Sequence, residues 1–207
     1  MQSLPTSEQV DTLHLLRLGG GAARPDLEAQ VGAEAVSALV DDGLATATAA
    51  RVSLTPAGRQ AHEAALAADL DERGVRSHVD ACYQRFLVLN AEVLALCTDW
   101  QVRTDGGAPA INDHSDPAYD DAVVARLGAV SAEAAAVLAD LAGALPRLAP
   151  YASDLASAAG RVRDGDVDYL TNPRVRCFHS TWFELHEDLL ATLGIDRASE
   201  GEPAVAQ

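Results

Sequence analysis

The chain has 207 residues, a formal net charge of −16 at pH 7 and a hydrophobic fraction of 48%. That length fits one or two globular domains with a real core, and the alanine-rich composition favours helices. The negative charge argues against non-specific binding to nucleic acid or to anionic membranes. The sequence has no long apolar run, no signal-peptide pattern and no cysteine framework. We therefore predict a cytoplasmic protein.

The first third of the chain predicts short helices followed by a β-hairpin. Apolar residues at helical spacing predict helices over 7–17, 26–31 and 33–42, each followed closely by glycine. The alternating segment 44–54 predicts a hairpin, and a helix is expected to begin near Arg59. Three helices, a hairpin and a further helix are the order of a winged helix-turn-helix domain, which we place at residues 1–75.

The segment Leu54-Thr55-Pro56-Ala57-Gly58-Arg59 resembles the sequence that closes the wing in transcriptional regulators of the MarR type. The resemblance covers about residues 7–70. It implies a winged helix that contacts DNA, a homodimer, and regulation by a ligand. The candidates for DNA contact are Arg17, Arg24, Ser37 and Arg51.

The charge of this N-terminal part opposes strong DNA binding. Residues 1–75 contain five arginines and eleven acidic residues, a balance of −6. The predicted recognition helix, 33–42, offers one serine and three acids, and the predicted wing offers Arg51 alone. Because recognition helices need basic or polar side chains toward the groove, we expect DNA binding to be weakened or lost.

Beyond residue 75 the pattern predicts helices throughout. We expect helices over 79–103, 116–145, 151–162 and 175–193, with loops at 105–115 and 165–173. Four helices with short connections suggest an all-α bundle at residues 76–197, followed by a disordered tail at 198–207. The expected fold class is therefore mainly α, with an N-terminal winged helix and a helical bundle that binds a small molecule.

The segment 177–190, CFHSTWFELHEDLL, concentrates aromatic, histidine and acidic residues on one predicted helix. At 100° per residue, one face gathers His179, Trp182, Phe183, His186, Leu190 and Leu193. Glu184 and Asp188 fall toward the opposite, solvent-facing side. The two histidines lie about 10.5 Å apart along the axis, too far to share one metal ion, so we expect neither a metal nor another cofactor.

The long helix 79–103 places Tyr83, Asn90 and Gln101 within its apolar face. We interpret these polar groups, together with nearby aromatic rings, as the wall of a small-molecule pocket. The predicted ligand-binding residues are Tyr83, Phe86, Asn90, Cys97, Trp100, Gln101, His114, Tyr119, His179, Trp182, Phe183 and His186. The alternative is a buried polar network that fixes helix register, with Asn90 and Gln101 bonded to the two histidines.

Three functions remain open at this point. The first is a ligand-responsive, transcriptional-regulator-like protein. The second is a regulator-derived enzyme or ligand-binding protein that has lost DNA binding and works in the helical domain. If it is an enzyme, His179, His186 and His114 are the candidate acid–base residues, because histidine titrates near neutral pH. The third is a protein-interaction module.

Overall fold

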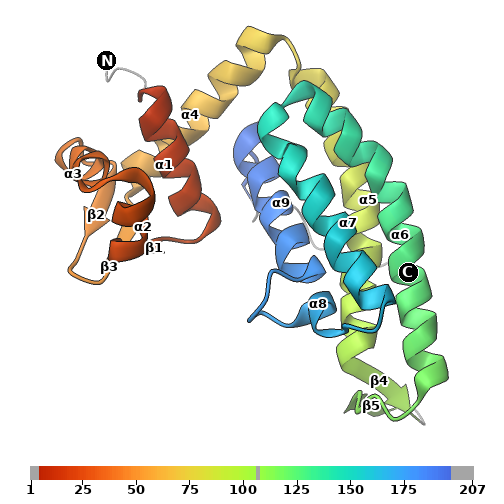
Figure 1. Cartoon of the computed structure of the whole chain (residues 1–207). Coiled ribbons are helices and arrows are strands. Elements are labelled where there is room, and N and C mark those ends of the chain that lie inside the picture. Colours follow the sequence, from red (N-terminus) through yellow and green to blue (C-terminus); the bar gives the residue numbers. More distant parts are fainter. Residues whose placement is uncertain (1–4, 106–107, 197–207) are drawn as a thin grey trace. The chain divides into compact units, whose positions relative to one another are not determined.

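The computed structural model describes residues 5–105 and 108–196, and it is mainly helical with small antiparallel sheets, as predicted (Figure 1). The chain divides into two compact units. Unit 1 comprises Met1–Arg76 and Glu187–Gln207, and unit 2 comprises Ser77–His186. The tail predicted at 198–207 lies outside the described residues.

Unit 1 combines helices with a three-stranded antiparallel sheet of order β1-β3-β2. Its elements are α1 (Ser7–Leu18), β1 (Ala22–Ala23), α2 (Arg24–Val31), α3 (Ala33–Asp41), β2 (Ala45–Ala47), β3 (Arg51–Leu54) and α4 (Pro56–Arg73). Their apolar faces meet in one core, built from Leu13, Leu16, Leu27, Val36, Leu39, Leu44, Ala45 and Val52. The predicted helices and hairpin are present; strand β1 was not predicted, because two alanines give no periodic signal.

The junction between β3 and α4 depends on two residues, Thr55 and Gly58. The Thr55 hydroxyl accepts a hydrogen bond from Gly58 N at 2.9 Å and donates one to Gly43 O at 2.7 Å, which caps α4. Pro56 takes the first helical position, so α4 begins three residues before the predicted Arg59. A Cβ at position 58 would collide with the carbonyl oxygen of Leu44, so the close approach requires glycine.

Unit 2 contains long helices that lie side by side. Its elements are α5 (Arg76–Gln101), β4 (Val102–Asp105), β5 (Ala108–Ile111), α6 (Pro117–Ala144), a 3-10 turn η1 (Pro146–Leu148), α7 (Ala149–Arg163), α8 (Asp168–Thr171) and α9 (Phe178–Leu193). The last seven residues of α9 belong to unit 1. Asp116 caps α6 as predicted, accepting bonds from the backbone N–H groups of Ala118 and Tyr119.

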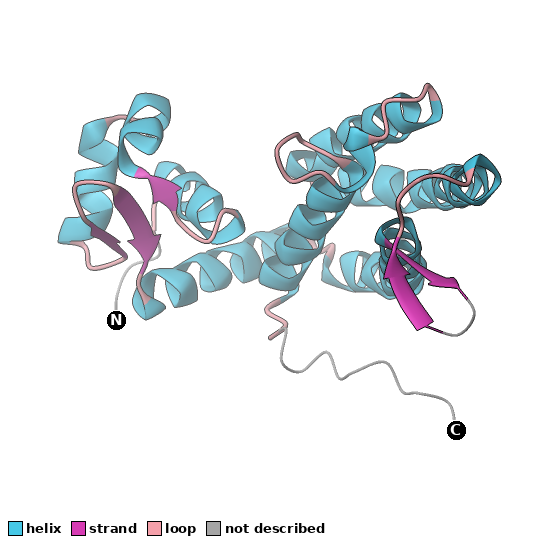
Figure 2. Ribbon diagram, turned by 90° about the horizontal axis from the view of Figure 1, so that it is seen from below, coloured by secondary structure: helices cyan, strands magenta, loops and turns pink. Residues whose placement is uncertain are grey.

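The expectation that residues 76–197 are all helical is wrong at 102–111. Strands β4 and β5 form an antiparallel hairpin, with Val102 opposite Ile111 and Asp105 opposite Ala108 (Figure 2). The sequence contains the signal for it: β-branched Val102 and Thr104 precede a Gly-Gly pair, a combination typical of hairpins. The four-residue helix α8, inside the predicted loop 165–173, is too short to give a periodic pattern.

Helix α6 is long and apolar enough, by length and composition alone, to cross a membrane. A third of its apolar stretch is buried, and core helices of soluble proteins pass the same test. Arg126 and Asp140 of α6 pair with Asp99 and Arg85 of α5, respectively. These charges favour a helix that packs within a water-soluble domain.

We expect Gly58→Ala to lower the free energy of unfolding by about 2–3 kcal/mol, because the added Cβ overlaps the Leu44 carbonyl. Urea denaturation followed by circular dichroism measures this change. The control is Gly143→Ala in α6, where an added Cβ meets nothing within 4 Å. It should raise stability by about 0.5–1 kcal/mol. A Gly58→Ala protein as stable as wild type would contradict the packing described.

Candidate functional site

The ring of His186 belongs to a buried aromatic cluster in unit 2. Trp182 stacks on Phe86 with ring centroids 4.7 Å apart, and the His186 ring lies 5.2 Å from Phe86 and 6.2 Å from Tyr83. The Trp182 indole Nε1 donates a hydrogen bond to Asn90 Oδ1 at 3.0 Å, whereas a histidine was the expected partner. Five predicted ligand-binding residues therefore lie together, packed on one another; their role in binding a ligand stays a prediction.

The predicted orientation of α9 is only partly right. His186 and Trp182 are buried, His179 is half-buried, and Phe183 is 48% exposed. Asp188, expected in solvent, is 1% exposed, while Glu184 bonds the exposed Arg176 at 2.8 Å. The prediction assumed that only one face of this helix is buried. Its second half is buried on several sides, because the consecutive residues Asp188, Leu189, Leu190, Ala191 and Thr192 are all buried.

Two further predicted ligand residues, Cys97 and Gln101, lie near the end of α5 in different surroundings. Burial, with a smaller effect of the nearby Cys177 thiol, raises the pKa of the Cys97 thiol to about 12. Cys97 is therefore neutral and unreactive at physiological pH, and acts as an apolar residue. The Gln101 side chain is exposed, contrary to its predicted place on the buried face; its backbone carbonyl accepts a bond from Asn112 N at 2.9 Å.

The β4–β5 hairpin and the start of α6 hold His114 in a second polar group. His114 has a φ of 58°, and its ring lies against the Trp100 ring, tilted by 39°, with centroids 4.5 Å apart. Its Nδ1 lies 3.0 Å from Asp120 Oδ2, and Asn112 Nδ2 donates to Asp120 Oδ1 at 2.9 Å. Because a carboxylate only accepts, the bond to Asp120 requires a hydrogen on His114 Nδ1, which also lies 3.2 Å from Asn112 Nδ2.

Tyr119, the last predicted ligand residue, also belongs to this hairpin group. Its hydroxyl donates to the Asp99 carbonyl at 2.9 Å, and the Arg103 guanidinium lies 4.6 Å from its ring centroid. Phe86 and Trp100 are fourteen residues apart on α5, or about 21 Å by helical rise. The aromatic cluster and the hairpin group are therefore separate, not the single pocket predicted.

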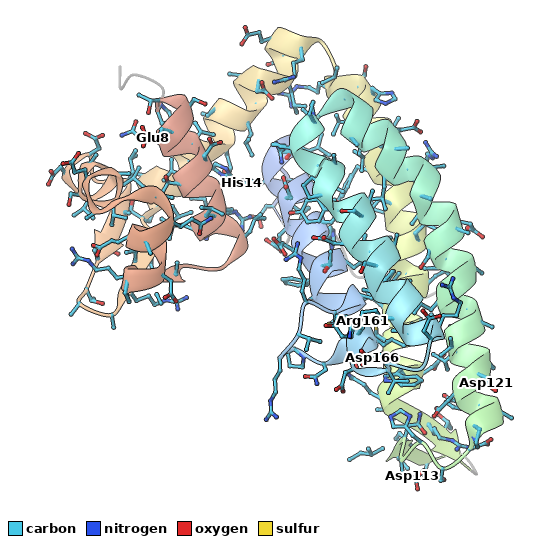
Figure 3. All side chains as sticks on the ribbon, viewed as in Figure 1. Glu8, His14, Asp113, Asp121, Arg161 and Asp166 are labelled. Atoms are coloured by element: carbon cyan, nitrogen blue, oxygen red, sulfur yellow. The ribbon has the colours of Figure 1, made fainter. Side chains whose placement is uncertain are left out.

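A cavity of about 640 Å³ lies between α6 and α7. Alanine and glycine form most of its wall, and they are too short to fill the space between the two helices. The larger or polar residues that line it are Asp121, Val124, Ser131, Leu138, Leu155, Arg163 and Phe178. Figure 3 labels Asp121 near the start of α6. Sequence reasoning missed this cavity, since alanine-rich faces carry no signal that separates a wall from a packed surface.

The predicted DNA-contacting residues are Arg17, Arg24, Ser37 and Arg51. Ser37 is exposed on α3, and Arg51 is exposed with its Nη2 bonded to Gly20 O at 2.8 Å. Arg17 is largely buried and bonds Glu187 at 3.0 Å, while Arg24 bonds Glu28 at 2.6 Å. Two of the three arginines are therefore already paired with carboxylates inside unit 1.

Sequence reasoning also missed a buried chain of titratable groups in unit 1, which we call the histidine chain. His14 Nε2 lies 3.2 Å from Asp188 Oδ2, and His14 Nδ1 lies 3.1 Å from His62 Nε2. Figure 3 labels His14 on α1. A signal existed for His62: it lies on the buried line Gly58, His62, Leu66 and Leu70 of α4, at spacing i, i+4.

Comparison of the chain with protein-family models, with curated proteins and with solved structures finds no match. Within residues 5–105 and 108–196, no three histidine, cysteine or acidic side chains are grouped so that they could hold a metal ion.

We expect His186→Ala to lower the free energy of unfolding by about 2–4 kcal/mol, because it leaves a hole beside Phe86 and Tyr83. Glu184→Ala, on the same helix, removes only an exposed ion pair and should cost less than about 1 kcal/mol. Thermal and urea unfolding of the two variants measure the difference. Equal stabilities would show that His186 is not part of the packed core.

Proposed function

We propose that the protein is a ligand-responsive regulator of the winged-helix type, a cytoplasmic homodimer whose unit 2 binds a small, largely apolar molecule. The observation that carries the proposal is the element order of unit 1, α1-β1-α2-α3-β2-β3, with the antiparallel strand order β1-β3-β2. In a winged helix, α3 is the recognition helix and the β2–β3 turn is the wing.

The cavity between α6 and α7 supports ligand binding. Its volume of about 640 Å³ lies within the range of small-molecule sites, which are mostly apolar with a few polar groups. Val124, Leu138 and Leu155 offer apolar contact. Arg163 and Asp121 offer charge, and the Ser131 hydroxyl, screened from water, has no hydrogen-bond partner among the described residues. These groups favour an apolar molecule with one polar or anionic substituent.

We expect the fluorescent probe 8-anilinonaphthalene-1-sulfonate, which is apolar with one anionic group, to bind this cavity. Ala135→Phe places a ring inside the cavity and should weaken binding at least about tenfold, or 1.4 kcal/mol. Fluorescence titration of the folded protein measures the affinity.

The matched control is Ala136→Phe. Ala136 is the next residue of α6, equally exposed, and about 100° further around the helix, where it does not line the cavity. Its affinity for the probe should equal that of wild type. Equal weakening in both variants, or no binding to the wild-type protein, would contradict a ligand site between α6 and α7.

DNA binding by unit 1 is expected to depend on few contacts. On α3, Ser37 is exposed beside the acidic Glu34, Asp41 and Asp42, and Arg51 is the wing's basic residue. With two or three phosphates neutralised, the slope of log affinity against log salt should be about −2. This is shallow for a DNA-binding protein, and affinity should be low away from a specific site.

Arg51→Ala should weaken DNA binding uniformly across sequences and, because the homodimer loses one arginine from each of its two wings, make the salt slope shallower by about 2. Fluorescence anisotropy with labelled duplexes at several salt concentrations measures both quantities. Arg174→Ala, an exposed arginine of unit 2, removes the same charge and should leave the slope unchanged. An Arg51→Ala protein with wild-type affinity and slope would contradict the role of the wing.

A second function is a ligand-binding protein or enzyme that keeps the winged helix as a scaffold. The observation that favours it is the pairing of Arg17 with Glu187 and of Arg24 with Glu28, which ties each guanidinium group to a carboxylate within unit 1. Absence of any DNA affinity at low salt, together with probe binding in the cavity, would select this function over the first.

A further inference from the structure

The histidine chain joins three helices of unit 1. Asp188, near the end of α9, bonds His14 of α1, which bonds His62 of α4. Asp188 and His62 are at most 1% exposed, and the His14 side chain is 19% exposed. The Thr192 hydroxyl lies 3.2 Å from the other carboxylate oxygen of Asp188. A titratable chain this well shielded from water must satisfy its hydrogen bonds internally.

The chemistry of Asp188, His14 and His62 determines which atoms of the histidine chain carry a hydrogen. The Asp188 carboxylate only accepts, so His14 Nε2 carries a hydrogen and donates it. His14 Nδ1 and His62 Nε2 face each other at 3.1 Å, so one hydrogen lies between them. With both rings neutral, that hydrogen is on His62 Nε2, and His14 Nδ1 accepts.

A first added proton keeps every bond. The proton is shared between two arrangements: either His14 is the imidazolium and donates to His62 Nε2, or His62 is the imidazolium and still donates to His14 Nδ1. In both arrangements His14 Nε2 donates to Asp188, and His62 Nδ1 gains a hydrogen. A second added proton makes both rings imidazolium ions, so that the N–H groups of His14 Nδ1 and His62 Nε2 point at each other. The bond between His14 and His62 is then lost, and two charged rings lie buried against each other.

We propose that the histidine chain is a proton-operated clasp. It holds the last turns of α9 on α1 and α4 while it carries no added proton or one, and it releases them when it takes up a second. This inference does not depend on whether unit 1 binds DNA.

The charged groups around the chain do not account for the release. Arg17 of α1 and Glu187 of α9 pair with each other at 3.0 Å. Arg59 and Glu63 of α4, with Asp196 beyond α9, line a cavity of about 510 Å³ beside them. The acids outnumber the arginines, so the surrounding charge does not oppose the addition of either proton to the histidine chain. The second proton is excluded by hydrogen-bond geometry, as long as His14 and His62 face each other in the closed state, in which the chain's bonds are formed.

The sign of the pH effect follows from proton linkage. Below neutral pH the open state can bind a proton on each histidine, whereas the closed chain holds only one. The open state therefore binds more protons, and lowering the pH favours opening. The effect is separable from acid unfolding if the pH stays above the range in which carboxylates titrate.

Hydrogen exchange followed by mass spectrometry tests the clasp. In the wild-type protein, protection of the backbone in residues 187–195 should fall about tenfold between roughly pH 7.5 and pH 5, after correction for the intrinsic exchange rate. His62→Gln keeps a side-chain amide that can donate to, or accept from, His14 Nδ1, and it binds no proton. Its protection should change less than about twofold over the same range.

His78→Gln, an exposed histidine of α5, is the control and should follow the wild-type profile. Constant wild-type protection, or a pH profile unchanged in His62→Gln, would overturn the proposal. If His62→Gln does not fold, nitrogen NMR of the wild-type imidazole rings decides. His62 Nδ1 should gain a hydrogen as the first proton binds, and a His62 Nδ1 that stays without hydrogen throughout the range would overturn the clasp.

Discussion

Helix α9 is buried on nearly every side of its last turns, so each polar group there needs a partner within the protein. Trp182 Nε1 meets Asn90, Glu187 meets Arg17, and Asp188 meets His14. The first of these bonds lies in unit 2 and the other two lie in unit 1. Within 177–190, the rings of Phe178, Trp182 and His186 are buried in unit 2, and Glu187 and Asp188 pair inside unit 1, whereas Phe183 is 48% exposed.

Much of the fold could be predicted because local chemistry and periodicity agree. The Leu54–Arg59 segment predicted the end of the hairpin and the start of a helix, and the structure supplies the reason: Thr55 caps α4, and Gly58 is required beside Leu44. Asp116-Pro117 likewise marked the start of α6. The β4–β5 hairpin was missed because four-residue strands offer only two residues per face; the helix was predicted to continue to 103, and a loop was predicted at 105–115.

The candidate site was harder to predict, because periodicity gives a direction but not a neighbour. It placed Trp182, His186 and Phe86 inside, correctly, yet joined them to Trp100, about 21 Å from Phe86 along α5, and to His114, which lies against Trp100. It also assigned Asp188 to solvent, because nothing local indicated that His14, 174 residues earlier in the chain, would cover it. The cavity between α6 and α7 depends on what alanines leave unfilled, which only the packing of the two helices defines.

The central functional claim is that the space between α6 and α7 is a preformed apolar site. A crystal structure determined under xenon pressure tests it most directly, since xenon enters dry apolar cavities without chemical help from the protein. The account predicts xenon between the two helices, in contact with Leu138, Leu155 and Phe178. Side chains closed over that space, with xenon absent there and bound elsewhere in unit 2, would contradict it.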